Sequence, residues 1–373
     1  MQYEIAMRRK IILILFKINL ITPNLNYLMR IVHVVRMWPT NSDPQHGSFI
    51  KAHVIATQKL GHDIRVVSLG PTPLKDEEIS NYHSNTLKGP IGWRTKLNLV
   101  KKAIHDLNGC DMLHIHGGSA DTAYILIRLK SKYGKSLKYA VTEHQSHWFY
   151  GAPLGAKITA KLADLRSAVS PALSEIIKKN GKTTFIPNIL QKPTESSIKT
   201  IYKRKEKNHR DFLFVGDIVD TIKGISGILK AWEIHSNTFK KDKLTIVGDG
   251  PDKQKLKNRF CDLGRLEWKG RFEVHEVHEE MFKNDILIVN SKIETFSMVI
   301  GEALERGMYV ICSPCKGPQG VYPKCDSLNF RKSFLYNELA NFMSEAKRPS
   351  EPIFLDDFRE NKIMLILENW YSS

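Results

Sequence analysis

Two glutamates late in the chain have a spacing that could serve a binding site. Glu294 and Glu302 are separated by seven residues in the stretch ETFSMVIGE, which follows the apolar run DILIVN. The run predicts a buried strand, and the residues after it predict a short helix that Ser297 caps and Gly307 ends. On a helical wheel the two carboxylates lie roughly 80° apart, so both can face one region beyond the helix N-terminus.

The start of such a helix favours an anion, because its first N–H groups lack partners within the helix and carry partial positive charge. A phosphate bound there, with a carboxylate on either side to bind hydroxyl groups, would suit a nucleotide sugar. The spacing also fits a capped helix with a solvated face, on which Glu302 and Glu305 would meet only water.

The elements around this stretch alternate between apolar β-branched runs and amphipathic segments. One series runs from IVHVVR to TFIPN, and a second starts at DFLFVG and continues through KLTIVG, DILIVN and MYVICS. Buried strands that alternate with helices indicate parallel sheets covered on both faces. The sequence therefore predicts an α/β fold of two Rossmann-like, doubly wound domains that face a cleft and hold a ligand between them.

The expected organisation divides the 373 residues into five parts. An N-terminal domain at 29–195 and a C-terminal domain at 211–350 are joined by a basic linker at 196–210. Residues 351–373 form a closing amphipathic helix that packs back on the N-terminal domain. Residues 1–28 form an extension whose deletion should be tolerated. Its basic start and apolar run also suit a signal peptide or anchor, although Lys17 interrupts the run and no small-residue cleavage site follows.

The composition of the chain favours some kinds of binding partner over others. Against 39 Asp and Glu, 56 Lys and Arg give a net charge of +17, which favours an anionic partner. Basic stretches at 96–102 and 128–138 mark either a peripheral site on an anionic membrane or a solvated positive face. No nucleic acid is expected, because the basic runs lack a recognisable binding module. An NAD or FAD enzyme is disfavoured, since no G-x-G-x-x-G follows the first strand.

The five cysteines have no repeating spacing. They indicate reduced thiols and a cytoplasmic protein. The CSPC stretch at 312–315 could instead be a redox pair, or the start of a zinc site with Cys325, but a fourth zinc ligand has no evident source.

Together these features resemble glycosyltransferase family 4, the group 1 glycosyltransferases, which have two Rossmann-like domains in the GT-B fold and a signature of Glu, seven residues and Glu. The resemblance covers most of residues 29–323. The pieces that carry it are MRIVHVV with a glycine loop at Gly47, GHDIRVVS, DMLHIHG, VTEH, AVSPAL, IPN, FVGDIVDTIKG, IVGDGP and ETFSMVIGEALERGMYVICS.

The resemblance implies donor-site roles in the C-terminal domain. Glu294 would contact hydroxyls of the donor sugar, Glu302 would contact the ribose, and Lys223 would bind the diphosphate and stabilise the charge that develops on it as the glycosidic bond breaks. Backbone N–H groups near the sugar and diphosphate would come from Phe296, Ser297 and Met298.

Other roles implied by the resemblance lie outside that stretch. Gly47 would let the backbone approach the donor phosphates. Backbone near Phe272 would contact the base. His116 and His144 follow apolar strands and should face the cleft. The resemblance makes them candidates for acceptor and sugar contacts, and His144 is a catalytic candidate beside Glu294 and Lys223.

One position departs from the family. The glycine after the first strand of the C-terminal domain is usually followed by an arginine that shares the diphosphate, and here that position is Asp217. A carboxylate would repel a diphosphate unless it turns away or binds something else. Arg271 or Lys292 could compensate.

The expected activity is that of a retaining, hexosyl-transferring glycosyltransferase. It would move a sugar from a nucleoside diphosphate to a carbohydrate or lipid-linked glycan acceptor in bacterial capsular, cell-surface or lipopolysaccharide synthesis, with no metal or other cofactor. Another GT-B activity, a nucleotide-sugar epimerase or phosphorylase, stays open. So does a non-catalytic member that binds a sugar nucleotide, which Asp217 favours slightly.

Overall fold

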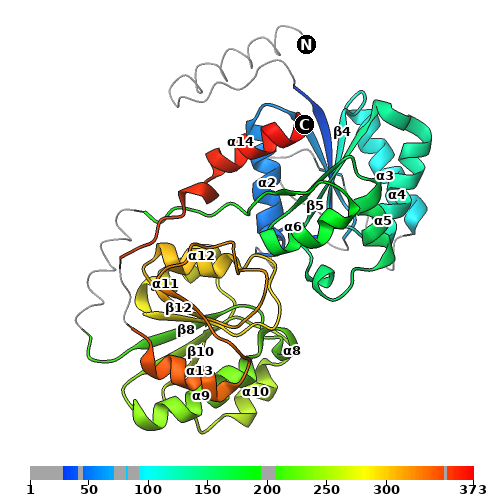
Figure 1. Cartoon of the computed structure of the whole chain (residues 1–373). Coiled ribbons are helices and arrows are strands. Elements are labelled where there is room, and N and C mark those ends of the chain that lie inside the picture. The colour runs from blue at the N-terminus through cyan, green and yellow to red at the C-terminus, as the bar shows by residue number, and fades with distance from the viewer. Residues whose placement is uncertain (1–27, 41–44, 71–80, 83–91, 195–206, 348–350) are drawn as a thin grey trace.

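The computed structural model describes residues 28–40, 45–70, 81–82, 92–194, 207–347 and 351–373. All but the last residue of the predicted extension and most of the predicted linker lie outside these ranges. The described chain forms two parallel sheets with helices on both faces of each, one above the other in Figure 1. The predicted fold class is confirmed.

The N-terminal sheet has the strand order β3-β2-β1-β4-β5-β6-β7, and every neighbouring pair is parallel. Its strands are β1 (Arg30–Val35), β2 (Asp63–Ser68), β3 (Asn81–Tyr82), β4 (Met112–His116), β5 (Lys138–Glu143), β6 (Leu165–Ala168) and β7 (Thr184–Phe185). Strand β3 is not predicted by the sequence, because its two residues are too few to show a periodic pattern.

Alternate residues of β1 show why the N-terminal sheet is covered on both faces. Ile31 and Val35 pack in a cluster with α2, whereas Val32 and Val34 pack in a cluster with α3 and α4. The helices of this domain are α2 (Ser48–Lys59), α3 (Trp93–Asp106), α4 (Ala120–Tyr133), α5 (Leu154–Leu162) and α6 (Pro171–Ile177), with short 3-10 turns η1 (Gly134–Ser136), η2 (Ser146–Phe149) and η3 (Lys178–Asn180).

The C-terminal sheet repeats the plan, with the order β10-β9-β8-β11-β12-β13 and parallel pairs throughout. Its strands are β8 (Asp211–Val215), β9 (Lys243–Val247), β10 (Leu266–Trp268), β11 (Ile286–Val289), β12 (Tyr309–Cys312) and β13 (Leu328–Phe330). The helices are α8 (Asp220–Lys223), α9 (Ile225–Thr238), α10 (Lys253–Arg259), α11 (Val274–Lys283), α12 (Met298–Glu305) and α13 (Tyr336–Glu345).

The end of the chain returns to the first domain. After the turn η5 (Asp356–Phe358), helix α14 (Glu360–Tyr371) lies beside α2. It buries Ile363, Leu367 and Trp370 in the cluster that α2 shares with β1, while Leu365 is 44% exposed. Helix α14 is therefore part of the N-terminal core although it follows the C-terminal domain in sequence.

Apolar residues also join the two domains. One buried cluster contains Trp148 and Leu173 from the first domain together with Phe296 and Ile300 from the second. Within the described part of the chain, no helix is both long enough and apolar enough to cross a membrane.

Candidate active site

A cavity of about 880 Å³ lies between the two domains. The N-terminal domain contributes the loop before α2 and the first turns of that helix, and the C-terminal domain contributes the carboxyl ends of β8, β9 and β10 and the start of α12. Of the predicted site residues, these line the cavity: Gly47, Asp217, Lys223, Phe272, Glu294, Ser297, Met298 and Glu302.

The loop before α2 lies against this cavity because Gly47 can adopt a left-handed backbone, with φ of 75°. A Cβ at this position would lie 2.6 Å from the carbonyl carbon of Met37, so a side chain has no room. Two residues earlier, Gln45 Nε2 donates a hydrogen bond of 2.9 Å to the carbonyl oxygen of Phe272. This bond links the two domains across the cavity.

Lys223 and Glu294 form an ion pair at the cavity wall. Lys223 Nζ donates to Glu294 Oε1 at 2.7 Å, and the two side chains are only 26% and 15% exposed. Burial acts against the ammonium, but the Glu294 carboxylate outweighs it, so the pKa of Lys223 is raised. Lys223 is therefore a fixed cation at neutral pH.

The loop that carries Glu294 is held closely from behind. Gly317 leaves no space for a Cβ beside the Glu294 carbonyl oxygen, and Ser313 donates from its hydroxyl to the carbonyl oxygen of Ser291. These contacts come from the segment that follows β12, so the position of the glutamate depends on a neighbouring strand end.

Helix α12 begins at Met298, but Ser297 does not cap it through its side chain as the sequence predicted. Ser297 adopts a left-handed backbone with φ of 65°, and its hydroxyl is buried with no hydrogen-bond partner among the described residues. That hydroxyl can therefore bind a ligand in the cavity. The Phe296 side chain turns away and packs against Tyr322 and Phe358, so only its backbone remains near the site.

The two acids on α12 have different surroundings. Glu302 lines the cavity, and Nε2 of His278 from α11 lies 3.6 Å from its carboxylate. Glu305 is fully buried and pairs with Arg359 at 2.5 Å. The solvated-face interpretation is therefore wrong for Glu305, which fastens α12 to the segment before α14. Sequence reading missed His278, whose only signal is its place on an amphipathic helix.

Asp217 is paired with a cation. Arg271 Nη2 donates to Asp217 Oδ1 at 2.8 Å, with side chains 35% and 60% exposed, and both residues line the cavity. Lys292, the other cation considered for compensation, is exposed and is not among the residues that line the cavity.

His116 and His144 lie elsewhere than expected. Both are buried, and neither is among the lining residues. His116 Nδ1 is 3.3 Å from His144 Nε2, and His116 Nε2 is 3.1 Å from His33 Nδ1. Burial lowers the pKa of all three imidazoles. The expectation that they face the cleft is wrong: Phe49 of α2 packs on His144 and itself lines the cavity, and His116 packs between the rings of His114 and His144.

One group of described residues has the spacing of a metal site. It consists of His33, His114 and His116, whose ligand atoms lie within 4.8 Å of one another. However, His114 Nδ1 already bonds the Tyr371 hydroxyl at 2.8 Å and its Nε2 bonds the Thr142 hydroxyl at 2.8 Å. An ion would have to displace one of these bonds, so the group fits a network of neutral imidazoles better than a metal site.

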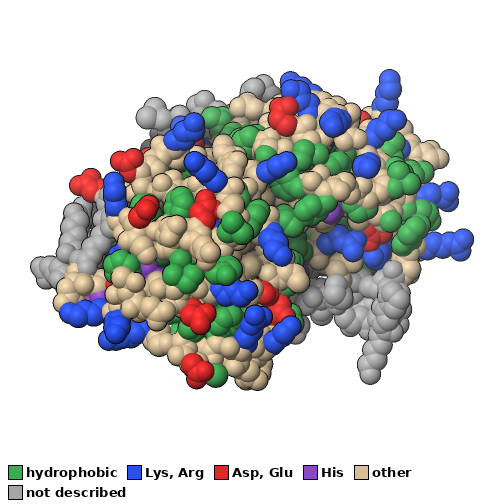
Figure 2. Space-filling model, turned by 60° about the horizontal axis from the view of Figure 1, so that its bottom comes forward, with side chains coloured by type: hydrophobic (Ala, Val, Ile, Leu, Met, Phe, Trp, Pro, Cys, Tyr) green, Lys and Arg blue, Asp and Glu red, His purple; other side chains and the backbone are tan. Residues whose placement is uncertain are grey.

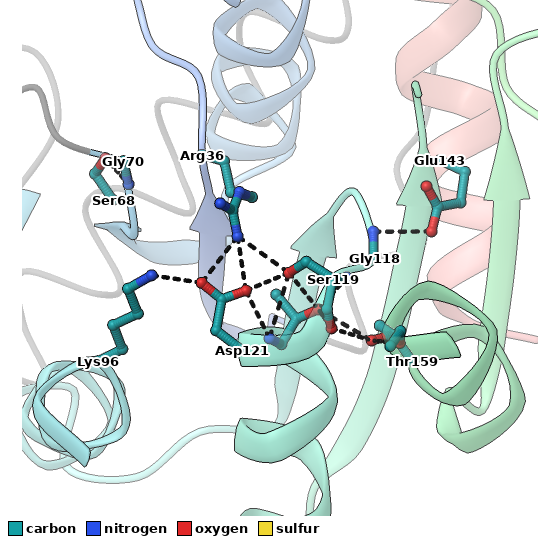
Figure 3. A network of polar contacts seen from close by, with 11 residues as sticks. Arg36, Ser68, Gly70, Lys96, Gly118, Ser119, Asp121, Glu143 and Thr159 are labelled. Atoms are coloured by element: carbon teal, nitrogen blue, oxygen red, sulfur yellow. Dashed lines mark hydrogen bonds and ion pairs between the residues drawn. The ribbon is translucent and has the colours of Figure 1, made fainter. Parts of the chain in front are cut away.

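A second polar network lies at the carboxyl edge of the N-terminal sheet (Figure 3). Asp121 at the start of α4 accepts from Arg36 at 2.7 Å and from Lys96 at 2.5 Å. Nearby, the Gly118 N–H donates to Glu143 at 2.8 Å. Burial raises the pKa of Glu143 to about 7. The sequence reading did not single out these residues, although Glu143 stands directly before His144.

The CSPC stretch ends β12, and both of its cysteines are buried. A hydrogen bond between the two thiols raises the pKa of Cys312 and lowers that of Cys315. All five cysteines of the chain are unpaired.

Comparison with known proteins agrees with this architecture. The sequence model of the family described as Glycosyl transferases group 1 matches residues 198–323, the part that carries Lys223, Arg271, Glu294 and Glu302. The chain carries a group 1 glycosyltransferase domain. The predicted resemblance to the group 1 glycosyltransferases and the predicted enzyme class, a glycosyltransferase, are confirmed.

Curated relatives of this glycosyltransferase are distant. An uncharacterized glycosyltransferase of Haemophilus influenzae is 24% identical over 274 residues, which are 69% of this chain and 74% of that protein. A putative teichuronic acid biosynthesis glycosyltransferase, TuaC of Bacillus subtilis, is 24% identical over 340 residues, which are 79% of this chain and 84% of that protein.

Solved structures share the fold. The lipopolysaccharide outer core galactosyltransferase WaaB in its apo form has a TM-score of 0.68 and 17% identity, with 92% of this chain and 99% of that chain covered. Anabaena HepE in complex with UDP and glucose has a TM-score of 0.68 and 15% identity, with 92% and 100% covered.

Proposed function

We propose that this glycosyltransferase transfers a hexosyl group from a nucleoside diphosphate sugar with retention of the anomeric configuration. The observation that carries the proposal is the arrangement of the interdomain cavity, where the Lys223 ammonium, the Glu294 and Glu302 carboxylates and the start of α12 face one space. HepE, which has the same fold, was solved with UDP and glucose, and this supports a nucleotide-sugar donor.

In the proposed complex, the diphosphate lies between Lys223 and the first turn of α12. When the bond between the sugar and the diphosphate breaks, negative charge grows on the phosphate oxygens. A fixed ammonium and the positive end of a helix stabilise that charge without a metal. Glu294 binds sugar hydroxyls while it holds Lys223, and Glu302 binds the ribose hydroxyls.

The buried Ser297 hydroxyl and the backbone of residues 296–298 would add donors near the diphosphate. Gly47 would let the first domain approach the phosphates from the other side of the cavity, and the backbone near Phe272 would contact the base. The group that transfers the proton stays unassigned, and His116 and His144 stay candidates on the acceptor side that would have to act from behind α2.

The acceptor is proposed to be a carbohydrate or lipid-linked glycan of bacterial cell-surface polysaccharide or lipopolysaccharide, in line with the names of TuaC and WaaB. A cytoplasmic protein, peripheral on an anionic membrane surface, would meet such an acceptor. On the face drawn in Figure 2, Lys and Arg side chains are scattered among acidic ones instead of gathering in one stripe. Sedimentation with anionic vesicles tests this location, and absence of binding at low salt contradicts it.

A thermal-shift panel of UDP, GDP, ADP and CDP and their sugars tests the donor site, because a ligand that binds only the folded chain raises its melting temperature. We expect one base to stabilise the protein at millimolar concentration with EDTA present. Glu302→Ala should reduce that shift, whereas Glu233→Ala, on the exposed side of α9, should not. If no compound in the panel shifts the melting temperature, the donor-site assignment is wrong.

Product analysis separates the remaining alternatives. With the donor that binds, a transferase releases a nucleoside diphosphate when a glycan acceptor is supplied. An epimerase returns an isomeric nucleotide sugar, a phosphorylase needs inorganic phosphate, and a non-catalytic binder releases nothing.

A further inference from the structure

The carboxyl ends of three neighbouring strands form the C-terminal wall of the cavity. Gly216 and Asp217 follow β8, Gly248 follows β9, and Arg271 follows β10. Since β9 lies between β8 and β10 in the sheet, the ion pair from Arg271 to Asp217 crosses the end of the middle strand.

The middle of this wall is bare backbone. Gly216 and Gly248 have φ of 152° and 144°, and a Cβ on Gly248 would collide with the carbonyl oxygen of Gly216. At Gly248 the place of a side chain is taken by the Gly216 carbonyl, so glycine there lets the ends of β8 and β9 pack closely, and both glycines line the cavity. The Gly248 N–H donates a hydrogen bond of 3.0 Å to the carbonyl oxygen of Gly270. This bond attaches the loop that carries Arg271 to the end of β9.

Charges on the wall show why an additional cation is needed. Three carboxylates line it, on Asp217, Glu294 and Glu302, and Lys223 is already bonded to one of them. Three further cations, Lys59, Lys192 and Arg359, line the cavity from outside the C-terminal sheet. On the C-terminal wall itself, a diphosphate that met Lys223 alone would be repelled by the carboxylates. Arg271 is the cation that offsets Asp217, and it reaches the cavity itself.

We propose that Arg271 is a second cation for the donor diphosphate and that Asp217 is the positioning residue that holds it across the wall. This inference rests on the proposed donor site. The pair is partly exposed and therefore weak, so a phosphate can compete with Asp217 for the guanidinium. The planar guanidinium can bond two phosphate oxygens through parallel N–H groups in one fixed geometry, which a freely rotating ammonium does not provide.

The first experiment measures the affinity of the whole protein for UDP, GDP, ADP and CDP and for the four matching nucleosides by titration calorimetry. In Arg271→Ala, affinity for the diphosphate that binds wild type should fall roughly 10- to 100-fold, while affinity for its nucleoside stays unchanged. Unchanged nucleoside binding also reports that the variant is folded. Arg259→Ala, an exposed arginine at the end of α10, is the matched control and should bind as wild type does.

The second experiment exchanges the two charges. Arg271→Asp places a second carboxylate beside Asp217 and should weaken diphosphate binding more than Arg271→Ala does. Adding Asp217→Arg restores one cation at the same wall and should recover most of the loss.

The outcomes separate this inference from the proposed function. If wild type binds a diphosphate and Arg271→Ala binds it equally well, or if the exchanged pair binds no better than Arg271→Asp, the role of Arg271 is wrong and the donor site stands. If wild type binds none of the four diphosphates, both are wrong.

Discussion

The carboxyl edges of the two sheets are built in the same way, but the polar residues at one edge line a cavity and those at the other are buried. At the C-terminal edge, acidic and basic side chains such as Glu302, Lys223 and Arg271 line an open cavity. At the N-terminal edge, His116, His144 and Glu143 are buried. The difference comes from what covers each edge, since α2 and α14 pack over the histidines whereas the interdomain cavity opens over the C-terminal strands. A polar residue at a strand end is thus available to a ligand only if no helix packs over it.

The largest effect on activity should follow from removing a charge at the C-terminal edge, called the charged edge below; the N-terminal edge is called the buried edge. Lys223→Ala removes the partly buried ammonium beside the proposed leaving group and should lower the turnover rate roughly 100- to 1000-fold, the range found when a stabilising donor is removed from other enzymes. The measurement is release of nucleoside diphosphate under saturating donor. Lys255→Ala, on the exposed side of α10, should keep full activity. A variant at Lys223 that works within threefold of wild type would show that the two edges do not differ in the predicted way.

The sequence predicted much of the charged edge. The strands at 211–216, 243–248 and 285–290, and the helix that follows the last of these, were readable from apolar runs and turn residues. Glu294, Glu302 and Lys223 stood in short motifs next to these runs, and all three line one cavity. The motifs were readable because Glu294, Lys223 and Glu302 follow the ends of β11, β8 and β11 by 5, 8 and 13 residues, with no other strand between.

The buried edge could not be read in the same way. His116 and His144 lie at the ends of strands, as Asp217 does. The sequence around the two histidines gives no sign that α2 packs against this edge of the sheet. The contact of α14 with α2 joins residues about 300 positions apart, as in the ion pair of Lys59 with Glu360. The pairing of Asp217 with Arg271 is likewise a product of strand order, since β10 reaches β8 only across β9.

The next effect should come from the acid of the buried edge. Because burial raises the pKa of Glu143 to about 7, the folded chain keeps a proton there that the unfolded chain, with a pKa near 4.5, releases. Its contribution to stability is therefore complete below pH 4.5 and is lost as the pH rises to about 7. At 1.4 kcal/mol per pH unit the loss is roughly 3 kcal/mol.

Glu143→Gln should remove this loss, because a neutral amide still accepts from the Gly118 N–H and never ionises. In urea unfolding at pH 5 and pH 8, the free energy of unfolding of the variant should rise relative to that of wild type at the higher pH only. The difference between the two proteins isolates Glu143 from the buried histidines, which both share. Glu175→Gln, an exposed acid on α6, is the control. Equal differences at the two pH values would mean that Glu143 is ionised in the folded protein.

The smallest effect, on stability, should come from helix α14, which packs over the buried edge. The Tyr371 hydroxyl on α14 bonds His114 Nδ1 at 2.8 Å and lies 3.2 Å from the Thr57 hydroxyl on α2. Tyr371→Phe keeps the packing and leaves a buried imidazole nitrogen without that partner, which should cost about 1–2 kcal/mol of unfolding free energy. Tyr336→Phe, on an exposed ring, should cost nothing measurable in the same urea titration. Turnover should be unchanged in both variants, because α14 covers a network that does not line the donor cavity. A Tyr371→Phe protein of normal stability and reduced turnover would instead place the histidine network in the reaction, and the contrast between the two edges would no longer hold.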